Sequence, residues 1–164
     1  MTYLIIRLAT LGNVAMTVPV IASLSSRYPD DRFIIASKKK LGAMFASMPN
    51  VEFREVDNHL TWRGVVQLWR DWKKGIDHVI DLQDIPKTRL FDCLMRMSGT
   101  KVTRIQYGRF RKWKVCFLGV KRELKSEFQR YQETFLKAGL QTDDSFIALP
   151  IDTTAAMHIE QRYG

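Results

Sequence analysis

Short apolar or β-branched runs of strand length alternate along the chain with longer segments whose apolar residues recur at helical spacing. The runs that predict strands are residues 3–8, 32–36, 51–56, 78–82 and 102–105. Strands that are apolar on both faces and separated by helices are typical of a parallel sheet covered on two sides. The pattern therefore predicts an α/β fold with a Rossmann-like, doubly wound parallel sheet.

Helical spacing predicts helices over residues 14–27, 39–48, 61–74, 87–97, 123–138 and 152–163. Thr61 is expected to cap the third of these helices, because its hydroxyl can accept from a backbone N–H of the first turn. Gly75 and Gly139 follow the ends of two helices, where a left-handed backbone conformation is common. These signals place the helix boundaries as well as the helices.

A turn with the sequence Leu11-Gly12-Asn13 lies where the first predicted strand passes into the first predicted helix. Such a junction faces the crevice above the carboxyl ends of the strands, where open α/β sheets bind ligands. The helix begins after Asn13, or it is kinked so that Thr17 caps it, because Pro19 fits only in a first helical turn. Gly12, Asn13 and Thr17 are therefore candidate site residues.

Composition fits one globular domain. The chain has 164 residues, of which 46% are hydrophobic and 26% are charged, which is enough apolar material for a core. Arg7 interrupts the first apolar run, so we interpret this run as folded structure and not as a secretory signal. The apolar stretches are shorter than the roughly 18 to 20 residues that cross a bilayer, so any membrane contact is expected to be peripheral.

Cysteine and histidine give no sign of a disulfide framework or a metal site. Cys93 and Cys116 lack metal-ligand spacing and fit reduced thiols in a cytoplasmic protein. The three histidines lie in separate predicted elements without acidic or cysteine partners at ligand spacing: His59, His78 and His158. The chain has no GxGxxG or P-loop pattern. We therefore expect no metal and no cofactor.

Positive charge is concentrated in one part of the chain. The net charge is +9, and nine of the 26 Lys and Arg residues lie between Lys101 and Lys125 against one acid, Glu123, so this span carries +8. Its centre interleaves Arg109 and Arg111 with aromatic residues. Such a segment suits an anionic partner, either a membrane surface or single-stranded nucleic acid. It could also be a strand and loop whose charges are simply solvated.

The sequence also resembles a known family. Residues 4–20, LIIRLATLGNVAMTVPV, followed by Arg27-Tyr28-Pro29, are similar to the N-terminal signature of the bacterial ADP-heptose:lipopolysaccharide heptosyltransferases and the wider family-nine glycosyltransferases. Further agreement is found in the following residues: Val79-Ile80-Asp81-Leu82-Gln83, the basic pair Lys87 and Arg89, Arg130-Tyr131, and Gly139. The resemblance covers essentially the whole chain but only the first half of such an enzyme.

The resemblance implies the N-terminal half of a two-domain GT-B glycosyltransferase. Residues 1–150 would form a Rossmann-like domain that binds a phosphorylated lipopolysaccharide-type acceptor, and residues 151–164 a linker helix toward a donor-binding C-terminal domain. The implied reaction transfers heptose, or a related sugar, from a nucleotide-sugar donor, inverts the anomeric centre and needs no metal. The enzyme would act at the inner face of the cytoplasmic membrane as a cytoplasmic, peripheral protein. This segment alone is expected to be inactive.

The position of Asn13 departs from the family pattern. The resemblance implies an Asp directly after the signature glycine, acting as the base that deprotonates the acceptor hydroxyl. An amide can orient a hydroxyl but cannot accept its proton near neutral pH. The protein would then be weakly active, use Asp81 or Asp84 as the base, or be non-catalytic. Asn13 could also serve simply as a helix cap.

The remaining candidate acceptor-binding residues are basic. They are Lys87, Arg89, Arg109 and Arg111, whose charges suit phosphate or carboxylate groups. A basic nucleic-acid-binding domain is the alternative from another functional class, although the resemblance favours a glycosyltransferase that does not bind nucleic acid.

Overall fold

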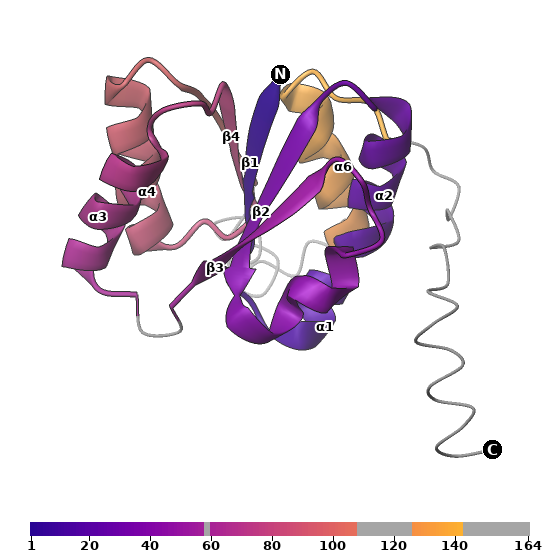
Figure 1. Cartoon of the computed structure of the whole chain (residues 1–164), viewed down its shortest axis with the longest axis horizontal. Coiled ribbons are helices and arrows are strands. Elements are labelled where there is room, and N and C mark those ends of the chain that lie inside the picture. Colours follow the sequence, from indigo (N-terminus) through magenta and orange to yellow (C-terminus); the bar gives the residue numbers. More distant parts are fainter. Residues whose placement is uncertain (58–59, 108–125, 143–164) are drawn as a thin grey trace, which may run out of the picture.

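A five-stranded sheet, with all strands parallel, forms the centre of the computed structural model, which describes residues 1–57, 60–107 and 126–142. The strands are β1 (Thr2–Ile6), β2 (Arg32–Lys38), β3 (Val51–Val56), β4 (His78–Asp81) and β5 (Lys101–Arg104). They lie in the order β3-β2-β1-β4-β5 (Figure 1). This arrangement confirms the predicted α/β class and the doubly wound parallel sheet.

Helices cover both faces of the sheet (Figure 1). One face carries α1 (Leu11–Ala15), α2 (Val18–Arg27), the 3₁₀ helix η1 (Lys39–Phe45) and α6 (Glu127–Lys137), and the other carries α3 (Trp62–Trp72) and α4 (Pro86–Met97). The alternation of side chains along β1 explains the two layers. Tyr3 and Ile5 join the first core, whereas Leu4 and Ile6 join the second.

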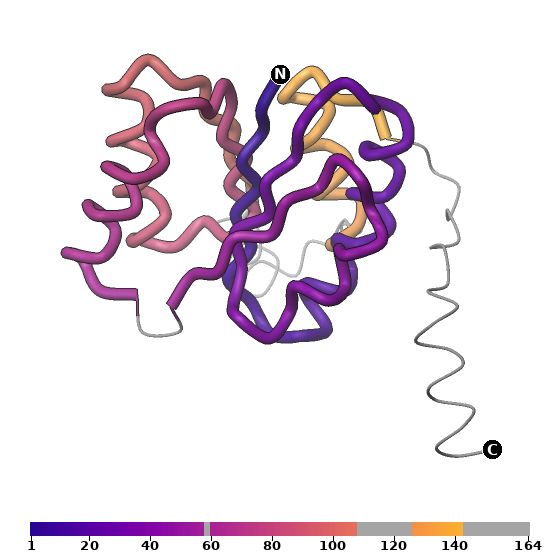
Figure 2. Tube along the Cα trace, viewed as in Figure 1, coloured from indigo at the N-terminus to yellow at the C-terminus, as the bar shows by residue number. Residues whose placement is uncertain are grey.

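Helix α6 returns to the start of the chain, as the light orange segment in Figure 2 shows. Tyr131 and Phe135 are fully buried in the same core as Ile5. Beyond the helix, the Gln141 N–H donates to the hydroxyl of Tyr28 at 3.0 Å. These contacts bring the first turn of α6 to the edge of the sheet at which the strands end.

The carboxyl ends of β1, β4 and β5 meet at that edge. Ile6 of β1 lies beside Asp81 of β4, and Asp81 lies beside Arg104 of β5. The hydrogen bonds continue one step further, since the Leu82 N–H donates to the Ile6 carbonyl at 3.0 Å. The segments that leave these three strands therefore start side by side.

Several predicted boundaries are confirmed. Thr61 caps α3, where its hydroxyl accepts from the Gly64 N–H at 3.1 Å. Gly139 has a φ of 86° just after α6, as expected for a left-handed residue at a helix end. Gly75 also has a positive φ, 79°, although α3 ends at Trp72 and places it one position later than expected.

Two predicted helices differ in the structure. The helix expected over residues 14–27 is two helices, broken at Met16 and Thr17 so that Pro19 falls in the first turn of α2, which is the kinked alternative. The helix expected over residues 39–48 is the shorter 3₁₀ helix η1. The linker helix expected over residues 151–164 lies outside the described residues. Within the described residues, the structure contains no helix long and apolar enough to cross a membrane.

Candidate functional site

A crevice of about 350 Å³ opens at the carboxyl ends of β1 and β4. It is lined by Arg7, Ala9, Asn13, Gln83, Ile85, Tyr107 and Glu127. β1 and β4 are neighbours in the sheet, but the chain continues from them toward opposite edges, to β2 and to β5. Such a topological switch point is where open α/β sheets bind ligands. We call this site the switch-point crevice.

Arg7 is a buried cation at the floor of the crevice. It directly follows β1, its exposed fraction is 5%, and its Nη1 donates to the Leu82 carbonyl at 2.7 Å and to the Tyr107 hydroxyl. The guanidinium also lies over the rings of Tyr107 and Tyr131, 5.9 and 5.4 Å from their centroids. A buried charge needs such partners to offset its lost hydration, so the position and orientation of Arg7 are fixed.

Glu127 faces Arg7 from the first turn of α6. Its Oε2 lies 3.6 Å from Nη2 of Arg7 and accepts from the Tyr131 hydroxyl at 3.2 Å, while its Oε1 lies 3.5 Å from Nη1 of Arg130. Ser126 caps the helix through a hydrogen bond from the Gln129 N–H. The Glu127 side chain is 31% exposed. Its carboxylate is therefore accessible to solvent in the crevice, although its contacts with Arg7, Arg130 and Tyr131 fix its orientation.

Two buried polar atoms of the crevice residues have no hydrogen-bond partner in the described structure: Nε of Arg7 and Oε1 of Gln83. Leaving a buried donor or acceptor unpaired costs about 1 to 3 kcal/mol. Native proteins accept such a cost mainly where a water, an ion or a ligand completes the bond. Both residues line the switch-point crevice, so a bound ligand or water that reaches these atoms would complete their hydrogen bonds.

Tyr107 closes the side of the crevice nearest β5. Its hydroxyl donates to the Leu82 carbonyl at 2.8 Å. Burial raises the pKa of Tyr107, and the neighbouring Arg7 acts against this shift. The phenol therefore remains protonated at neutral pH and lines the crevice with a hydroxyl that is already hydrogen-bonded to the Leu82 carbonyl and to Arg7.

The signature turn lies at the same crevice. Asn13 is exposed within α1, and its amide nitrogen donates to the Thr10 hydroxyl at 3.2 Å. Because Asn13 is the third residue of the helix and Thr10 stands at its N-cap, the helix-cap interpretation of Asn13 is wrong. Gly12 has helical backbone and open space around the position of a Cβ. Thr17 is buried and donates to the Val14 carbonyl at 2.6 Å, so it stabilises the break between the two helices.

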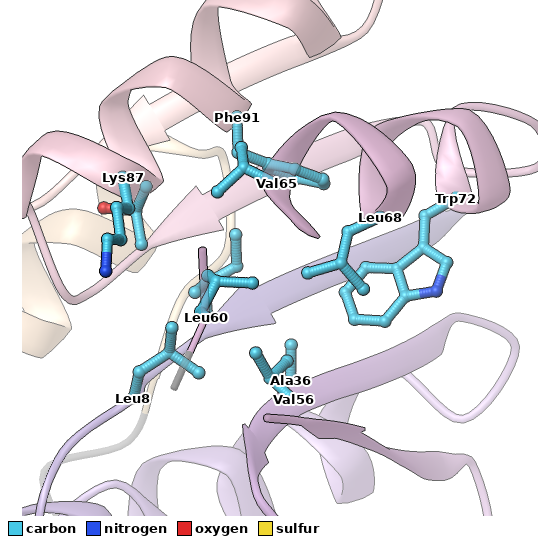
Figure 3. A pocket seen from close by; sticks show the side chains of 11 residues that line it. Leu8, Ala36, Val56, Leu60, Val65, Leu68, Trp72, Lys87 and Phe91 are labelled. Carbon is cyan, nitrogen blue, oxygen red and sulfur yellow. The ribbon is translucent and has the colours of Figure 1, made fainter. Parts of the chain in front are cut away.

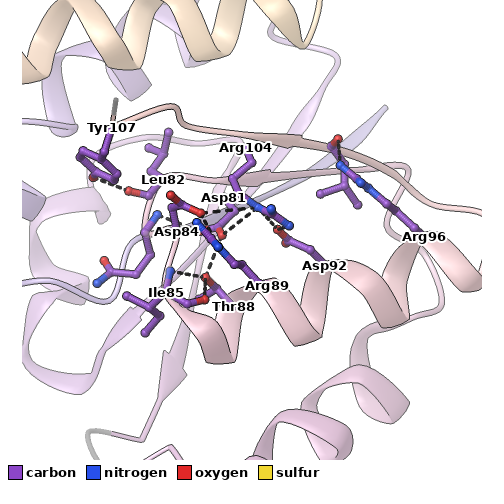
Figure 4. Close-up of polar contacts among 12 residues, drawn as sticks. Asp81, Leu82, Asp84, Ile85, Thr88, Arg89, Asp92, Arg96, Arg104 and Tyr107 are labelled. Carbon is purple, nitrogen blue, oxygen red and sulfur yellow. Dashed lines mark hydrogen bonds and ion pairs between the residues drawn. The ribbon is translucent and has the colours of Figure 1, made fainter. Parts of the chain in front are cut away.

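Asp81 and Asp84 belong to a separate ionic cluster beside the crevice (Figure 4). Asp81 is fully buried, and its two oxygens accept from the Thr88 hydroxyl and from the backbone N–H groups of Gln83 and Asp84. Asp84, with an exposed fraction of 6% and a φ of 51°, accepts from Nε of Arg89 at 2.8 Å. Neither carboxylate lines the switch-point crevice.

Asp92 completes this cluster from α4. Both Nε and Nη2 of Arg104 lie 2.8 Å from its Oδ2. Burial, followed by the charge of Asp81, raises the pKa of Asp92 to about 7, and burial also raises the pKa of Asp81. Because Asp81 accepts three hydrogen bonds that favour its ionised form, we place the shared proton on Asp92.

Lys87 lies away from the switch-point crevice. It lines a narrow apolar pocket of about 20 Å³ between the sheet, α3 and α4, together with side chains such as Leu8, Leu68, Trp72 and Phe91 (Figure 3). The structure therefore separates Lys87 from Arg89, which contacts Asp84 on the other side of the α4 N-terminus. The two members of the predicted basic pair do not share one site.

The basic span between Lys101 and Lys125 is only partly described. Arg104, one of its nine cations, is paired internally with Asp92 and lies 3.8 to 3.9 Å from carboxylate oxygens of Asp81 and Asp84. Its charge therefore stabilises the fold and is not presented to a partner. Arg109 and Arg111 lie outside the described residues.

Sequence reasoning did not select four of the residues that line the crevice: Arg7, Gln83, Tyr107 and Glu127. A signal existed for Arg7, because a lone cation directly after a buried strand must find partners within the fold. Glu127 gives no such signal. Its place in the crevice depends on the packing of α6 against the sheet, which periodicity alone does not determine.

Comparisons with known proteins agree with the fold. A scan against protein-family models finds no match. Among curated proteins, the lipopolysaccharide core heptosyltransferase OpsX of Haemophilus influenzae is 25% identical over 126 residues, which cover 76% of this chain and 35% of OpsX. This chain thus spans about a third of the length of that relative.

Two solved structures extend the comparison. E. coli heptosyltransferase WaaC, solved with ADP, has a TM-score of 0.59 and 17% identity, and the match covers 100% of this chain and 54% of WaaC. A family 9 glycosyl transferase from Veillonella parvula has a TM-score of 0.66 and 18% identity, with 99% of this chain and 50% of that protein covered. The fold is thus that of the N-terminal half of a GT-B glycosyltransferase, and the resemblance to the heptosyltransferases is confirmed.

Proposed function

We propose, from the resemblance of this chain to the N-terminal part of the heptosyltransferases, that it is the acceptor-binding part of a glycosyltransferase. The enzyme would transfer heptose, or a related sugar, from a nucleotide-sugar donor to the lipopolysaccharide core. Residues 1–150 would bind the acceptor, and residues 151–164 would lead to a second domain that binds the donor. The first part alone would not catalyse transfer.

One observation carries this proposal. Three of the segments that bear the resemblance, residues 4–20, 79–83 and 130–131, are far apart in the sequence, yet they lie at or next to the switch-point crevice, whereas Lys87 and Arg89 do not line it. Arg7 and Asn13 come from the first segment and Gln83 from the second, and the third directly contacts Glu127. A family signature that assembles around one crevice supports a shared ligand site there.

The crevice chemistry suits a sugar. The Arg7 and Gln83 atoms without partners offer one donor and one acceptor, the Asn13 amide offers both, and the Glu127 carboxylate offers further acceptors. A polyhydroxylated ring can pair with all of these groups at once, because each hydroxyl both donates and accepts. The buried cation at the floor would also favour an acceptor that carries phosphate or carboxylate groups.

The reaction that we propose is a direct displacement that inverts the anomeric carbon and needs no metal. The acceptor hydroxyl would be held in the switch-point crevice while the donor-binding domain presents the nucleotide sugar above it. Holding both reactants in line supplies much of the rate enhancement, because the bimolecular encounter becomes effectively intramolecular.

We further propose peripheral binding at the inner face of the cytoplasmic membrane. A lipopolysaccharide acceptor is anchored in a bilayer, and the basic and aromatic sequence around Arg109 and Arg111 suits the headgroup region of an anionic surface. Binding to vesicles containing anionic lipid should weaken as salt rises, because screening reduces the attraction. Binding that is equal on neutral and anionic vesicles would contradict this part of the proposal.

The test of the proposed function is sugar transfer by the full-length protein. The protein would be incubated with ADP-heptose and a lipopolysaccharide core acceptor, and mass spectrometry would follow the acceptor. We expect the acceptor mass to rise by one heptose as ADP is released. An unchanged acceptor with ADP-heptose and other nucleotide sugars, together with salt-dependent binding of oligonucleotides, would instead favour the nucleic-acid alternative.

A further inference from the structure

Transfer to a hydroxyl requires a group that takes up the hydroxyl proton, and Asn13 cannot be that group. Among the described residues that line the switch-point crevice, Glu127 is the one that carries a carboxylate. It reaches the crevice from α6, whereas Asn13 reaches it from α1. The crevice therefore retains an acidic side chain, supplied by a different helix.

The surroundings of Glu127 hold the carboxylate in a fixed orientation. The Arg7 and Arg130 guanidinium groups lie 3.6 and 3.5 Å from its two oxygens, and the Tyr131 hydroxyl donates to Oε2. Arg7 is itself fixed by the Leu82 carbonyl and two aromatic rings. The 31% exposure of the Glu127 side chain leaves it accessible to a substrate.

The other candidate carboxylates are less suited to proton uptake from a sugar. Asp81 is fully buried and accepts three hydrogen bonds, and Asp84 is held by Arg89. Both belong to the ionic cluster that links β4, α4 and β5. Their hydrogen bonds and ion pairs give both carboxylates a structural role, and neither lines the switch-point crevice.

We propose that the Glu127 carboxylate accepts the proton of the attacking acceptor hydroxyl. In this step the hydroxyl oxygen forms a bond to the anomeric carbon of the donor. The bond between that carbon and the nucleoside diphosphate breaks, and its electron pair leaves with the diphosphate. The hydroxyl proton moves to Glu127. The transfer to a carboxylate is feasible because the hydroxyl becomes strongly acidic as the new bond forms.

This assignment rests on the proposed function, and a rescue experiment in the full-length protein tests it. Glu127→Gln removes the proton acceptor while preserving the shape of the side chain. We expect kcat to fall by about 10² to 10⁴, the usual worth of a positioned base, with little change in the KM for the acceptor. Glu133→Gln, the same substitution six residues further along α6, should leave kcat unchanged.

A double variant, Glu127→Gln with Asn13→Asp, distinguishes two roles of Glu127: a base, or a structural partner of Arg7. Adding Asn13→Asp to Glu127→Gln supplies a carboxylate from α1 and should recover at least about tenfold in kcat, together with an acid limb in the pH profile that Glu127→Gln alone lacks. Glu127→Asp, which retains the charge, should keep more activity than Glu127→Gln. Far-ultraviolet circular dichroism and thermal unfolding would verify that each variant is folded.

The outcomes separate this inference from the proposed function. Transfer by the natural protein with equal rates for Glu127→Gln and Glu133→Gln would overturn the assignment of Glu127 alone. A loss in Glu127→Gln that Asn13→Asp does not relieve would also overturn it, because Glu127 would then act only by holding Arg7. Absence of transfer by the natural protein would overturn the proposed function and this assignment with it.

Discussion

Replacing Asp92 by Asn should change how the stability of the protein depends on pH. Asp92 is fully buried on α4, where Arg104 binds its Oδ2 and no described residue pairs with its Oδ1. Burial and the charge of Asp81 raise the pKa of Asp92 to about 7 from an ordinary value of 3.8. The folded state therefore holds a proton at pH values where the unfolded chain has released it.

The sign and size of the effect follow from this difference. A raised pKa contributes stability that is fully present below the unfolded-state value of 3.8, decreases above that value, and is lost once the pH has risen through the folded-state value of about 7. Between the two pKa values the free energy of unfolding should fall by up to about 1.4 kcal/mol per pH unit. From pH 5 to pH 8 the loss from this one group amounts to about 2 to 3 kcal/mol.

Urea unfolding at pH 5, 6, 7 and 8 measures this contribution. Asp92→Asn keeps an acceptor for Arg104 but does not titrate, so its free energy of unfolding should rise relative to the natural protein as the pH increases. Asp71→Asn, on the exposed side of α3, serves as the control and should run parallel to the natural protein. Parallel curves for Asp92→Asn as well would show that Asp92 holds no proton in the folded state and would refute the argument.

Two further substitutions test the packing and the end of α6. Phe135→Ala removes a fully buried ring that joins α6 to the sheet and should lower the free energy of unfolding by about 3 to 5 kcal/mol. Leu136→Ala, at a position that is 61% exposed, should change it little. Equal effects of the two substitutions in urea unfolding would contradict the packing of α6. Gly139→Ala forces a side chain onto a φ of 86° and should lower the free energy of unfolding by about 1 to 2 kcal/mol. Gly12→Ala, at a helical position with open space, should leave that free energy unchanged or raise it by up to about 1 kcal/mol. A higher melting temperature for Gly139→Ala than for Gly12→Ala would refute the assigned conformations.

The sheet and most helix boundaries could be predicted because they depend on local patterns. The runs of apolar residues in β1, β2 and β4 are buried on both faces, and period and length identify such strands. Thr61 and Gly139 mark helix ends through their own backbone chemistry. Pro19 likewise identified the break before α2, since it cannot lie in a helix interior.

The site was harder to predict, because it depends on which distant segments pack together. The signature turn identified Asn13, but the partner that shares its crevice, Glu127, lies on a helix more than a hundred residues later. Asp81, Asp84 and Arg104 had the residue types expected of a site, yet the structure pairs them with one another. Charge pairing within the fold cannot be distinguished from charge offered to a ligand until the tertiary contacts are known.

The position of the bound acceptor tests the central claim most directly. A crystal structure of the full-length protein with an acceptor analogue would show whether the switch-point crevice is the acceptor site. We predict an acceptor hydroxyl beside Glu127 and Asn13, with sugar oxygens bonded to Nε of Arg7 and, through a donated hydrogen bond, to Oε1 of Gln83. A donor nucleotide in this crevice, or an acceptor bound elsewhere on the chain, would contradict the account.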